Sequence, residues 1–236
     1  MDKPIDTNDR NIIGMNQDLL QLIKDYTTKE HTEINASLLG KSKDNLVSML
    51  LDLLTIYYND LNSSTMRELV VAVLAGYQPS LEKLGYNGFR QNTLTGKVEH
   101  CEIKPRNVRS DSTAKTPRKL DGSGNFTDYT WAKFRRHQEE NPNMLVAGFL
   151  DAHLIHIFEF SFNEQGFTSR LQEQLERRFP TGDITSEYLR SAQFSFTHYK
   201  DAESLKTIYI ASKQELTKAQ PHITKNLFNY LEKTAQ

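Results

Sequence analysis

The first 84 residues carry hydrophobic side chains at the spacing of amphipathic helices. Over residues 15–26, and again over residues 44–58, leucine, isoleucine, valine and tyrosine recur every three or four positions. That period places them along one face of a helix, because an α-helix turns once in 3.6 residues. Two helices are therefore predicted in this helical N-terminal part of the chain, residues 1–84.

A third helix is predicted over residues 65–75. Its first residues, from Thr65 to Glu68, have the pattern of a capping box, in which the two end side chains accept hydrogen bonds from the first backbone N–H groups. Gly76 suits the C-terminal end, because glycine readily adopts the left-handed conformation that closes many helices. Residues 79–84 are expected to add one or two helical turns.

Strand character begins at residue 86. Residues 86–91 and 97–104 are predicted strands, and the polar, glycine-containing residues 92–96 between them suit a hairpin connection. Proline has no backbone N–H, so Pro105 is expected to end the second strand.

The remaining elements are predicted to mix helix and strand. They are a loop over residues 105–125, helices over 130–140, 168–179 and 221–233, and strands over 144–150, 153–162, 193–199 and 205–211. Alternating aromatic residues indicate a core face in two strands, at Phe158, Phe160 and Phe162 and at Phe194 and Phe196. This order predicts an α/β (α+β mixed) fold, with a central mixed β-sheet flanked by helices. Without a repeat or an obvious linker, a single domain over residues 1–236 is expected.

Composition narrows the classes of protein to which this chain belongs. With 37% hydrophobic and 25% charged residues, it is typical of a soluble globular protein. No stretch approaches the ~20 apolar residues of a membrane helix, and the N-terminus lacks the basic start and apolar core of a signal peptide. The single cysteine, Cys101, excludes an internal disulfide and a cysteine-based zinc cluster. A cytoplasmic protein without a membrane segment is therefore expected.

Charge is balanced over the whole chain but not along it. The net charge is −1, yet residues 104–136 contain nine basic residues and three acidic ones. A local basic stretch is what contact with a phosphate backbone requires. The alternative is a solvated loop with no partner.

The candidate chemistry centres on Glu102 and Lys104. Side chains alternate along a strand, so Val98, His100, Glu102 and Lys104 share one face. A carboxylate and an ammonium group would then point at one place. Divalent cations prefer oxygen ligands, and a hydrolytic water needs a cation or a base beside it. Glu-x-Lys is also common on solvated strands, so further residues must support this interpretation.

Those further residues resemble the PD-(D/E)xK nucleases. The matching pieces are a helix over residues 65–76 with Glu68 inside it, the segment 85–89 (Gly-Tyr-Asn-Gly-Phe), and Glu102-Ile103-Lys104-Pro105. The chain is most similar to type II restriction endonucleases and the related strand-nicking enzymes of mismatch repair. The resemblance covers roughly residues 60–165, which would form the catalytic core of a restriction-endonuclease-like fold.

The resemblance implies a Mg²⁺-dependent, sequence-specific endonuclease that cuts double-stranded DNA as a homodimer. Glu102 and the residue at position 87 would hold Mg²⁺, and Lys104 would sit beside the attacking water and steady the scissile phosphate. Glu68 would reach the metal through water, or else only cap its helix.

Position 87 departs from the family pattern. An acid is expected there before Gly88, but the residue is Asn87, and asparagine offers only a neutral oxygen to a cation. Three explanations are open. An aspartate stands here in the natural protein, which is the favoured one; Glu82 or Glu99 supplies the acid; or the site is naturally non-catalytic. Strand alternation disfavours Glu99, because it points away from Glu102.

Contacts to DNA are expected from the basic stretch and from the glycine-containing segment 121–130. The predicted contact residues are Arg106, Arg109, Lys115, Lys119, Ser123, Asn125, Lys133, Arg135 and Arg136. Ser123, Asn125 and Thr127 can donate to phosphates or base edges. The alternative for segment 121–130 is a turn that caps the next helix at Asp128 or Thr130. Two rival functions remain: a DNA-binding protein with a degenerate nuclease fold, and a protein-interaction domain whose basic loop is merely solvated.

Overall fold

The structure is a computed structural model that describes residues 16–59, 64–80, 85–110, 112–151, 153–182 and 187–235. The chain divides into two compact units, Met1–His100 and Cys101–Gln236, called here the N-terminal and C-terminal units. Each is described by itself.

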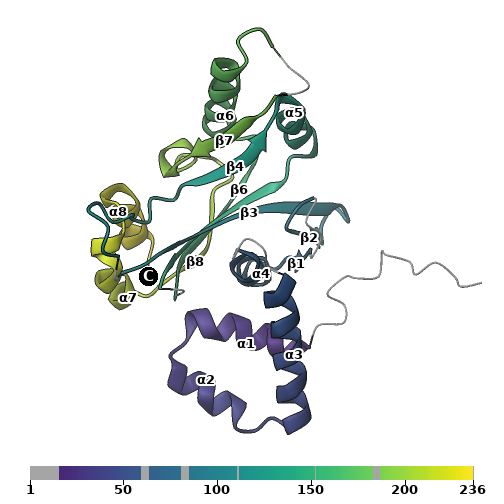
Figure 1. Ribbon diagram of the computed structural model, residues 1–236, viewed down its shortest axis with the longest axis vertical. Coiled ribbons are helices and arrows are strands. Elements are labelled where there is room, and N and C mark those ends of the chain that lie inside the picture. The colour runs from purple at the N-terminus through teal and green to yellow at the C-terminus, as the bar shows by residue number, and fades with distance from the viewer. Residues whose placement is uncertain are drawn as a thin grey trace, which may run out of the picture. The chain divides into compact units, whose positions relative to one another are not determined.

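The N-terminal unit is mainly helical (Figure 1). Its described elements are α1 (Gln17–Thr28), α2 (His31–Leu38), α3 (Lys43–Asn59), α4 (Thr65–Leu74), β1 (Gln78–Pro79), β2 (Gly88–Gln91) and the start of β3 (Val98–Val108). The three predicted helices correspond to α1, α3 and α4. Helix α2 was not predicted, because Ile34 alone is buried on it and the hydrophobic period is weak.

The ends of α4 correct one prediction and confirm another. The capping box predicted at Thr65 is wrong: Thr65 is already helical, Ser64 is the N-cap, and no side chain caps the helix there. Gly76 follows the helix at φ +77°, as expected of a closing glycine. The helical turns predicted from residue 79 are wrong at their start, since Pro79 lies in β1, while residues 81–84 lie outside the described residues.

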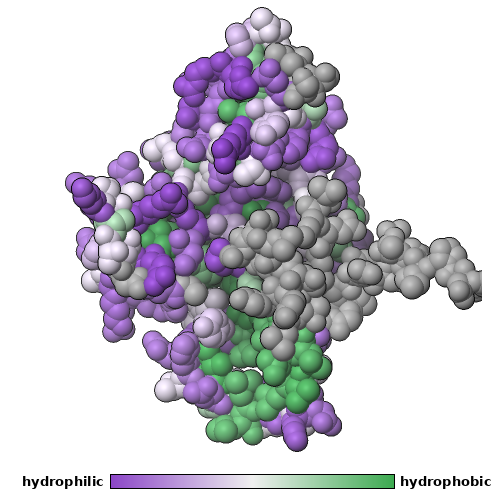
Figure 2. Space-filling view, viewed as in Figure 1, coloured by the Kyte–Doolittle hydropathy of each residue, from purple (hydrophilic) through white to green (hydrophobic). Residues whose placement is uncertain are grey.

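Apolar surface gathers over the helices of the N-terminal unit (Figure 2). On α3, Leu46, Val47, Leu50 and Leu51 are all exposed. A pocket of about 470 Å³ lies among these helices, with Leu19 and Ile23 of α1, Ile34 of α2 and Val70 of α4 in its wall.

The C-terminal unit contains most of the sheet. Its described strands are β4 (Gly124–Tyr129), β5 (Asn143–Leu150), β6 (His153–Ser161), β7 (Leu189–Phe194) and β8 (Lys206–Ile210), with β3 entering from the boundary. Its helices are α5 (Trp131–Glu140), α6 (Gln165–Arg178), α7 (Lys213–Ala219) and α8 (Lys225–Thr234), with short 3₁₀ turns at Phe196–His198 and Gln220–His222.

The strands form a mixed sheet in the order β1-β2-β3-β5-β6-β8, and β4 pairs with β7 in a separate two-stranded ribbon. Strand β3 is parallel to β5, whereas β5–β6 and β6–β8 are antiparallel. The predicted mixed α/β class with a central mixed sheet is confirmed. No helix in the described part of the chain is both long and apolar enough to cross a lipid bilayer.

Two predictions around residue 105 are wrong. Strand β3 does not stop at Pro105 but continues to Val108, with Pro105 opposite Ala147 of β5. On its other side, the only neighbour of β3 in the described chain is the four-residue strand β2. The backbone N–H that Pro105 lacks therefore interrupts no hydrogen bonds to a strand beyond β2 on that side. The loop predicted to residue 125 ends earlier, because β4 begins at Gly124 and its Phe126 and Tyr129 are buried. Thr130 does cap α5, accepting a hydrogen bond from the Lys133 N–H at 3.1 Å.

The predicted burial of the alternating aromatic residues is confirmed, but the strand predicted over residues 193–199 is wrong beyond residue 194, because β7 ends at Phe194 and Phe196 lies in a 3₁₀ turn. Phe158, Phe160 and Phe162 are fully buried, and Phe194 and Phe196 are 2% and 3% exposed. Residue register explains the arrangement: Glu102 lies opposite Met144 and Lys104 opposite Val146, and on β6 these continue to Phe160 and Phe158. Paired residues project on the same side of a sheet, so the two candidate residues point toward the aromatic core.

Candidate functional site

Glu102 and Lys104 contact each other on β3, as strand alternation predicted. The Lys104 Nζ donates a hydrogen bond to Glu102 Oε1 at 2.5 Å, which forms an ion pair. Both side chains are largely buried, at 15% and 18% exposed, so they are desolvated compared with a surface pair. A charge pair at this depth persists only where both groups are well partnered. The pair is therefore shielded from water, unlike the solvated strand face that was the alternative.

Strand β4 holds Lys104 in place. The Lys104 ammonium lies 4.6 Å from the centre of the Phe126 ring, a cation–π contact. Gly124 allows β4 to pass closely: a Cβ at Gly124 would lie 2.9 Å from the Lys104 Cβ and 2.5 Å from Phe194 Cζ. Only glycine fits there, so the approach of β4 to the lysine stem depends on this residue.

A buried histidine–tyrosine pair lies near the same ion pair. Tyr129 Oη and His137 Nδ1 are 3.0 Å apart, and the His137 ring packs against Phe126 and Phe162. Burial lowers the pKa of His137 to about 4, although the nearby Glu102 carboxylate acts in the opposite direction. His137 is therefore neutral at pH 7. In the sequence, the indication that His137 is buried is its place on the same helical face as Phe134, three residues earlier.

In the N-terminal unit, the two other candidate residues contact each other. Asn87 Nδ2 donates a hydrogen bond to Glu68 Oε2 at 2.9 Å. The alternative that Glu68 only caps its helix is therefore not supported, because the N-cap of α4 has no side-chain hydrogen bond. The predicted four residues thus form two pairs, one in each unit.

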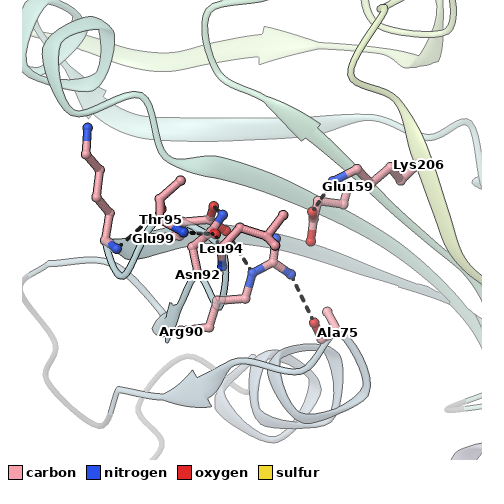
Figure 3. Close-up of polar contacts among 9 residues, drawn as sticks. Ala75, Arg90, Asn92, Leu94, Thr95, Glu99, Glu159 and Lys206 are labelled. Carbon is pink, nitrogen blue, oxygen red and sulfur yellow. Dashed lines mark hydrogen bonds and ion pairs between the residues drawn. The ribbon is translucent and has the colours of Figure 1, made fainter.

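The two alternative acids have different outcomes. Glu99 is occupied in the hairpin between β2 and β3, as Figure 3 shows: its carboxylate accepts from Arg90 Nε at 2.9 Å and from Asn92 Nδ2 at 2.6 Å. Asn92 also accepts from the backbone N–H groups of Leu94 and Thr95, which confirms the predicted hairpin turn. Glu99 therefore stabilises the hairpin. Glu82 lies outside the described residues.

A further buried carboxylate, Glu159 on β6, was not among the predicted site residues. It is 2% exposed, and its Oε1 lies 3.6 Å from Lys206 Nζ (Figure 3). Glu159 lies opposite Leu145, one residue out of step with Met144 and Val146, so it points to the other face of the sheet from Glu102. It is not part of the Glu102–Lys104 pair.

The donor set around Glu102 fits a hard cation only in part. Mg²⁺ is usually held by one or two carboxylates together with water and substrate phosphates. Glu102 offers one such carboxylate, and Lys104 balances its charge. Within the described residues no three or more His, Cys, Asp or Glu side chains form a group that could hold a metal ion. The donor set therefore meets the lower end of what Mg²⁺ usually requires from a protein.

The predicted DNA-contact residues divide into two sets. Arg106 is tied down, since its Nη1 donates to Asp121 Oδ1 at 2.9 Å and to Ser123 Oγ. The remaining predicted residues are exposed, namely Arg109, Lys115, Lys119, Asn125, Lys133, Arg135 and Arg136. Lys133 donates from its ammonium to the Asp128 carbonyl at 2.9 Å. The second set thus lies at the surface, whereas Arg106 stabilises the turn before β4.

Comparison with known proteins adds no relative to this description: no model of a protein family matches the chain, and no characterised protein matches it significantly.

Proposed function

We propose that this protein is a Mg²⁺-dependent endonuclease that hydrolyses phosphodiester bonds of double-stranded DNA at specific sequences, in the manner of type II restriction enzymes. The observation that carries the proposal is the desolvated Glu102–Lys104 pair on β3. In support, Glu68 and Asn87, the other two residues of the motif, also contact each other.

Each residue has a defined role in this proposal. Lys104 orients the attacking water and donates a hydrogen bond to the phosphate as negative charge develops there. Glu102 holds the cation together with a carboxylate expected at position 87, and Glu68 contributes through water. Mg²⁺, when bound, would polarise the phosphate and lower the pKa of its water. The product is expected to carry a 5′-phosphate and a 3′-hydroxyl.

The proposal also covers the oligomeric state and the cellular compartment. We expect two copies to act together, one on each DNA strand, in the cytoplasm. Cys101 is buried and forms no disulfide, which is what a reducing compartment would favour.

A second candidate function is a DNA-binding protein that has lost catalysis. It is favoured by Asn87, whose neutral amide donates its N–H to Glu68 and leaves the motif short of one negative charge. The third, a protein-interaction domain, predicts no salt-dependent DNA binding, whereas the other two functions require it.

Plasmid digestion with Mg²⁺ separates these candidates. The present protein, Asn87→Asp, and Asn87→Asp combined with Lys104→Ala should be compared. The nuclease proposal expects Asn87→Asp to cut and the added Lys104→Ala to abolish cutting. Lys206→Ala is the matched control, since it also removes an ammonium beside a sheet carboxylate, Glu159. Binding without cutting by all forms would favour the non-catalytic candidate.

A further inference from the structure

Strands β4 and β7 form a two-stranded ribbon with one apolar and one polar face. On the apolar face, Phe126 lies opposite Ala192 and Gly124 opposite Phe194. On the polar face, Asn125 lies opposite Gln193 and Thr127 opposite Ser191. Asn125, Thr127 and Gln193 are exposed and Ser191 is half-buried. These four residues form the polar ribbon face.

The polar ribbon face has dimensions that suit duplex DNA. Paired strands lie about 4.8 Å apart, and the major groove, about 12 Å wide, admits a two-stranded ribbon. Same-face residues recur about every 6.8 Å along a strand, which is about two base-pair steps of 3.4 Å. Asn and Gln can bond both edge atoms of adenine, and Ser and Thr can bond any base edge.

Helix α6 is fixed against the free edge of the ribbon. The buried Gln174 of α6 donates to the Gln193 carbonyl and accepts from the Gln193 N–H, both at 2.8 Å, and it also donates to the Arg170 carbonyl. Its amide therefore takes the place of a neighbouring strand on β7. Helix α6 lies beside β7 in Figure 1, and its arginines line a pocket together with Ser191 and Gln193 of the polar ribbon face.

These arginines line a pocket of about 380 Å³. It is called here the arginine pocket, and its wall is formed by Arg170, Gln174, Arg177, Arg178, Leu189, Ser191 and Gln193. Ser191 and Gln193 belong to both the pocket and the polar ribbon face, so the two surfaces are continuous.

The arginine pocket has unused donors and an excess of positive charge. Arg170 pairs with Glu173 and Arg178 with Glu187, at 2.9 and 2.8 Å. Arg177 forms no hydrogen bond or ion pair within the described residues. In addition, the Arg170 Nε is buried and has no hydrogen-bond partner. Three guanidinium groups against two carboxylates, with an orphan donor, suit a phosphate, which accepts several hydrogen bonds at once.

From these observations we infer that the polar ribbon face reads base edges of duplex DNA while the arginine pocket grips a backbone phosphate beside it. The choice of DNA as ligand rests on the proposed function. The surface goes beyond the predicted basic stretch, because apart from Asn125 and Thr127 none of its residues lies in that stretch.

Two variants separate reading from gripping. Binding to a pool of random-sequence duplexes is measured in EDTA, so that no cleavage occurs, and the bound fraction is sequenced. The double variant Asn125→Ala with Gln193→Ala should keep the overall affinity and salt slope but flatten the sequence preference. We expect a loss of about 5- to 150-fold in discrimination at each position read. Gln172→Ala is the matched control, because Gln172 is exposed on α6 and lies outside the arginine pocket.

The second variant, Arg177→Gln, tests whether the arginine pocket contacts a backbone phosphate. Its affinity should fall for all sequences alike, and the log–log salt slope should decrease by about one. Arg190→Gln is the matched control, because Arg190 is exposed on β7 but alternation turns it to the other face of the strand. Melting temperatures should match the parent in every case.

Three outcomes would overturn the inference, and they are distinguishable from failure of the nuclease proposal. Unchanged sequence preference in the double variant would mean that other residues read bases. An unchanged salt slope in Arg177→Gln would remove the phosphate grip. If Arg177→Gln binds inorganic phosphate more weakly than the parent protein but binds duplex DNA equally well, the pocket would be assigned to a free phosphate compound. Conversely, lost preference in the double variant of a protein that never cuts DNA would support the reading surface and reject the nuclease.

Discussion

Replacing Asn87 by aspartate is the most informative single change in this protein. In the structure the Asn87 amide donates to Glu68 Oε2 at 2.9 Å. Aspartate removes that donor and places a second carboxylate at the same distance. The pair then either repels or recruits a cation, and the second response is what a nuclease site requires.

The size of the effect follows from simple electrostatics. Two unit charges about 4 Å apart repel by about 4 kcal/mol at an effective dielectric constant near 20. This is an upper bound, since Glu68 and Asn87 are only half-buried. The lost hydrogen bond to a charged group adds about 1.5–3 kcal/mol. In a protein of this length each kcal/mol shifts the melting temperature by about 2–4 °C, so Asn87→Asp should melt several degrees lower in EDTA.

Magnesium should reverse this loss in the variant alone. A ligand at a hundred times its Kd stabilises the folded state by about 2.7 kcal/mol, whereas the parent protein, with an amide at position 87, should respond much less. Asn87→Ala is the control, because it removes the hydrogen bond without adding charge. Glu68→Gln in the Asn87→Asp background should relieve the repulsion.

Cleavage is the second measurement on the same variant. Losing a metal-holding carboxylate removes several kcal/mol of transition-state stabilisation, and each ~1.36 kcal/mol is tenfold in rate. Asn87→Asp should therefore raise single-turnover cleavage about a thousandfold or more without a matching rise in DNA affinity. If melting is unchanged in EDTA and in Mg²⁺, the Glu68–Asn87 pair does not hold a cation. Equal cleavage rates would mean that another acid completes the site.

Three further predictions concern the C-terminal unit. Lys104→Ala in a cleavage-competent background should abolish cleavage with little change in melting, and retained activity would remove the proposed mechanism; Lys206→Ala should leave cleavage intact. Gly124→Ala should destabilise the fold by about 1–3 kcal/mol, measured by urea unfolding, because its Cβ overlaps Phe194 and the lysine stem. Burial lowers the pKa of His137 to about 4 and of His156 to about 3. Each stays neutral in the folded state while the unfolded state gains protons, so stability should fall as pH drops below about 6.5, by about 2 kcal/mol per histidine at pH 5. His156→Leu should flatten that pH dependence, and an unchanged profile would contradict the assignment.

The parts of the fold that could be predicted are those with a local period. Helices α1, α3 and α4 follow from apolar residues every three or four positions, and β5 and β6 from continuous apolar runs on either side of Asp151. Glu102 and Lys104 could be predicted for the same reason. The alternation of side chains along a single strand places them on one face, so no knowledge of the neighbouring strands was needed. Helix α7 could also have been predicted, because Ser212 and Glu215 form a complete capping box.

The parts that were missed depend on pairing between distant segments. Strand β4 has polar, glycine-containing composition and forms only because β7, more than sixty residues later, pairs with it: Asn125 meets Gln193. The same holds for Pro105, whose place inside β3 is set by the parallel register with β5. Composition at these positions favours a loop, and the tertiary partner overrides it.

The register of β4 links the two halves of the proposed activity. Asn125 faces outward on the polar ribbon face, and the next residue, Phe126, faces inward with its ring 4.6 Å from the Lys104 ammonium. A slip of one residue would turn Phe126 to solvent and point Asn125 at Lys104. The proposed base reading and catalysis would therefore depend on the same register, which Gly124 fixes by fitting against Lys104 and Phe194 where no other side chain has room. The order of residues 121–130 predicted Asn125 as a contact to base edges, but neither its pairing with Gln193 nor the support of Lys104 by Phe126 could be predicted, because packing and the pairing with β7 set that register.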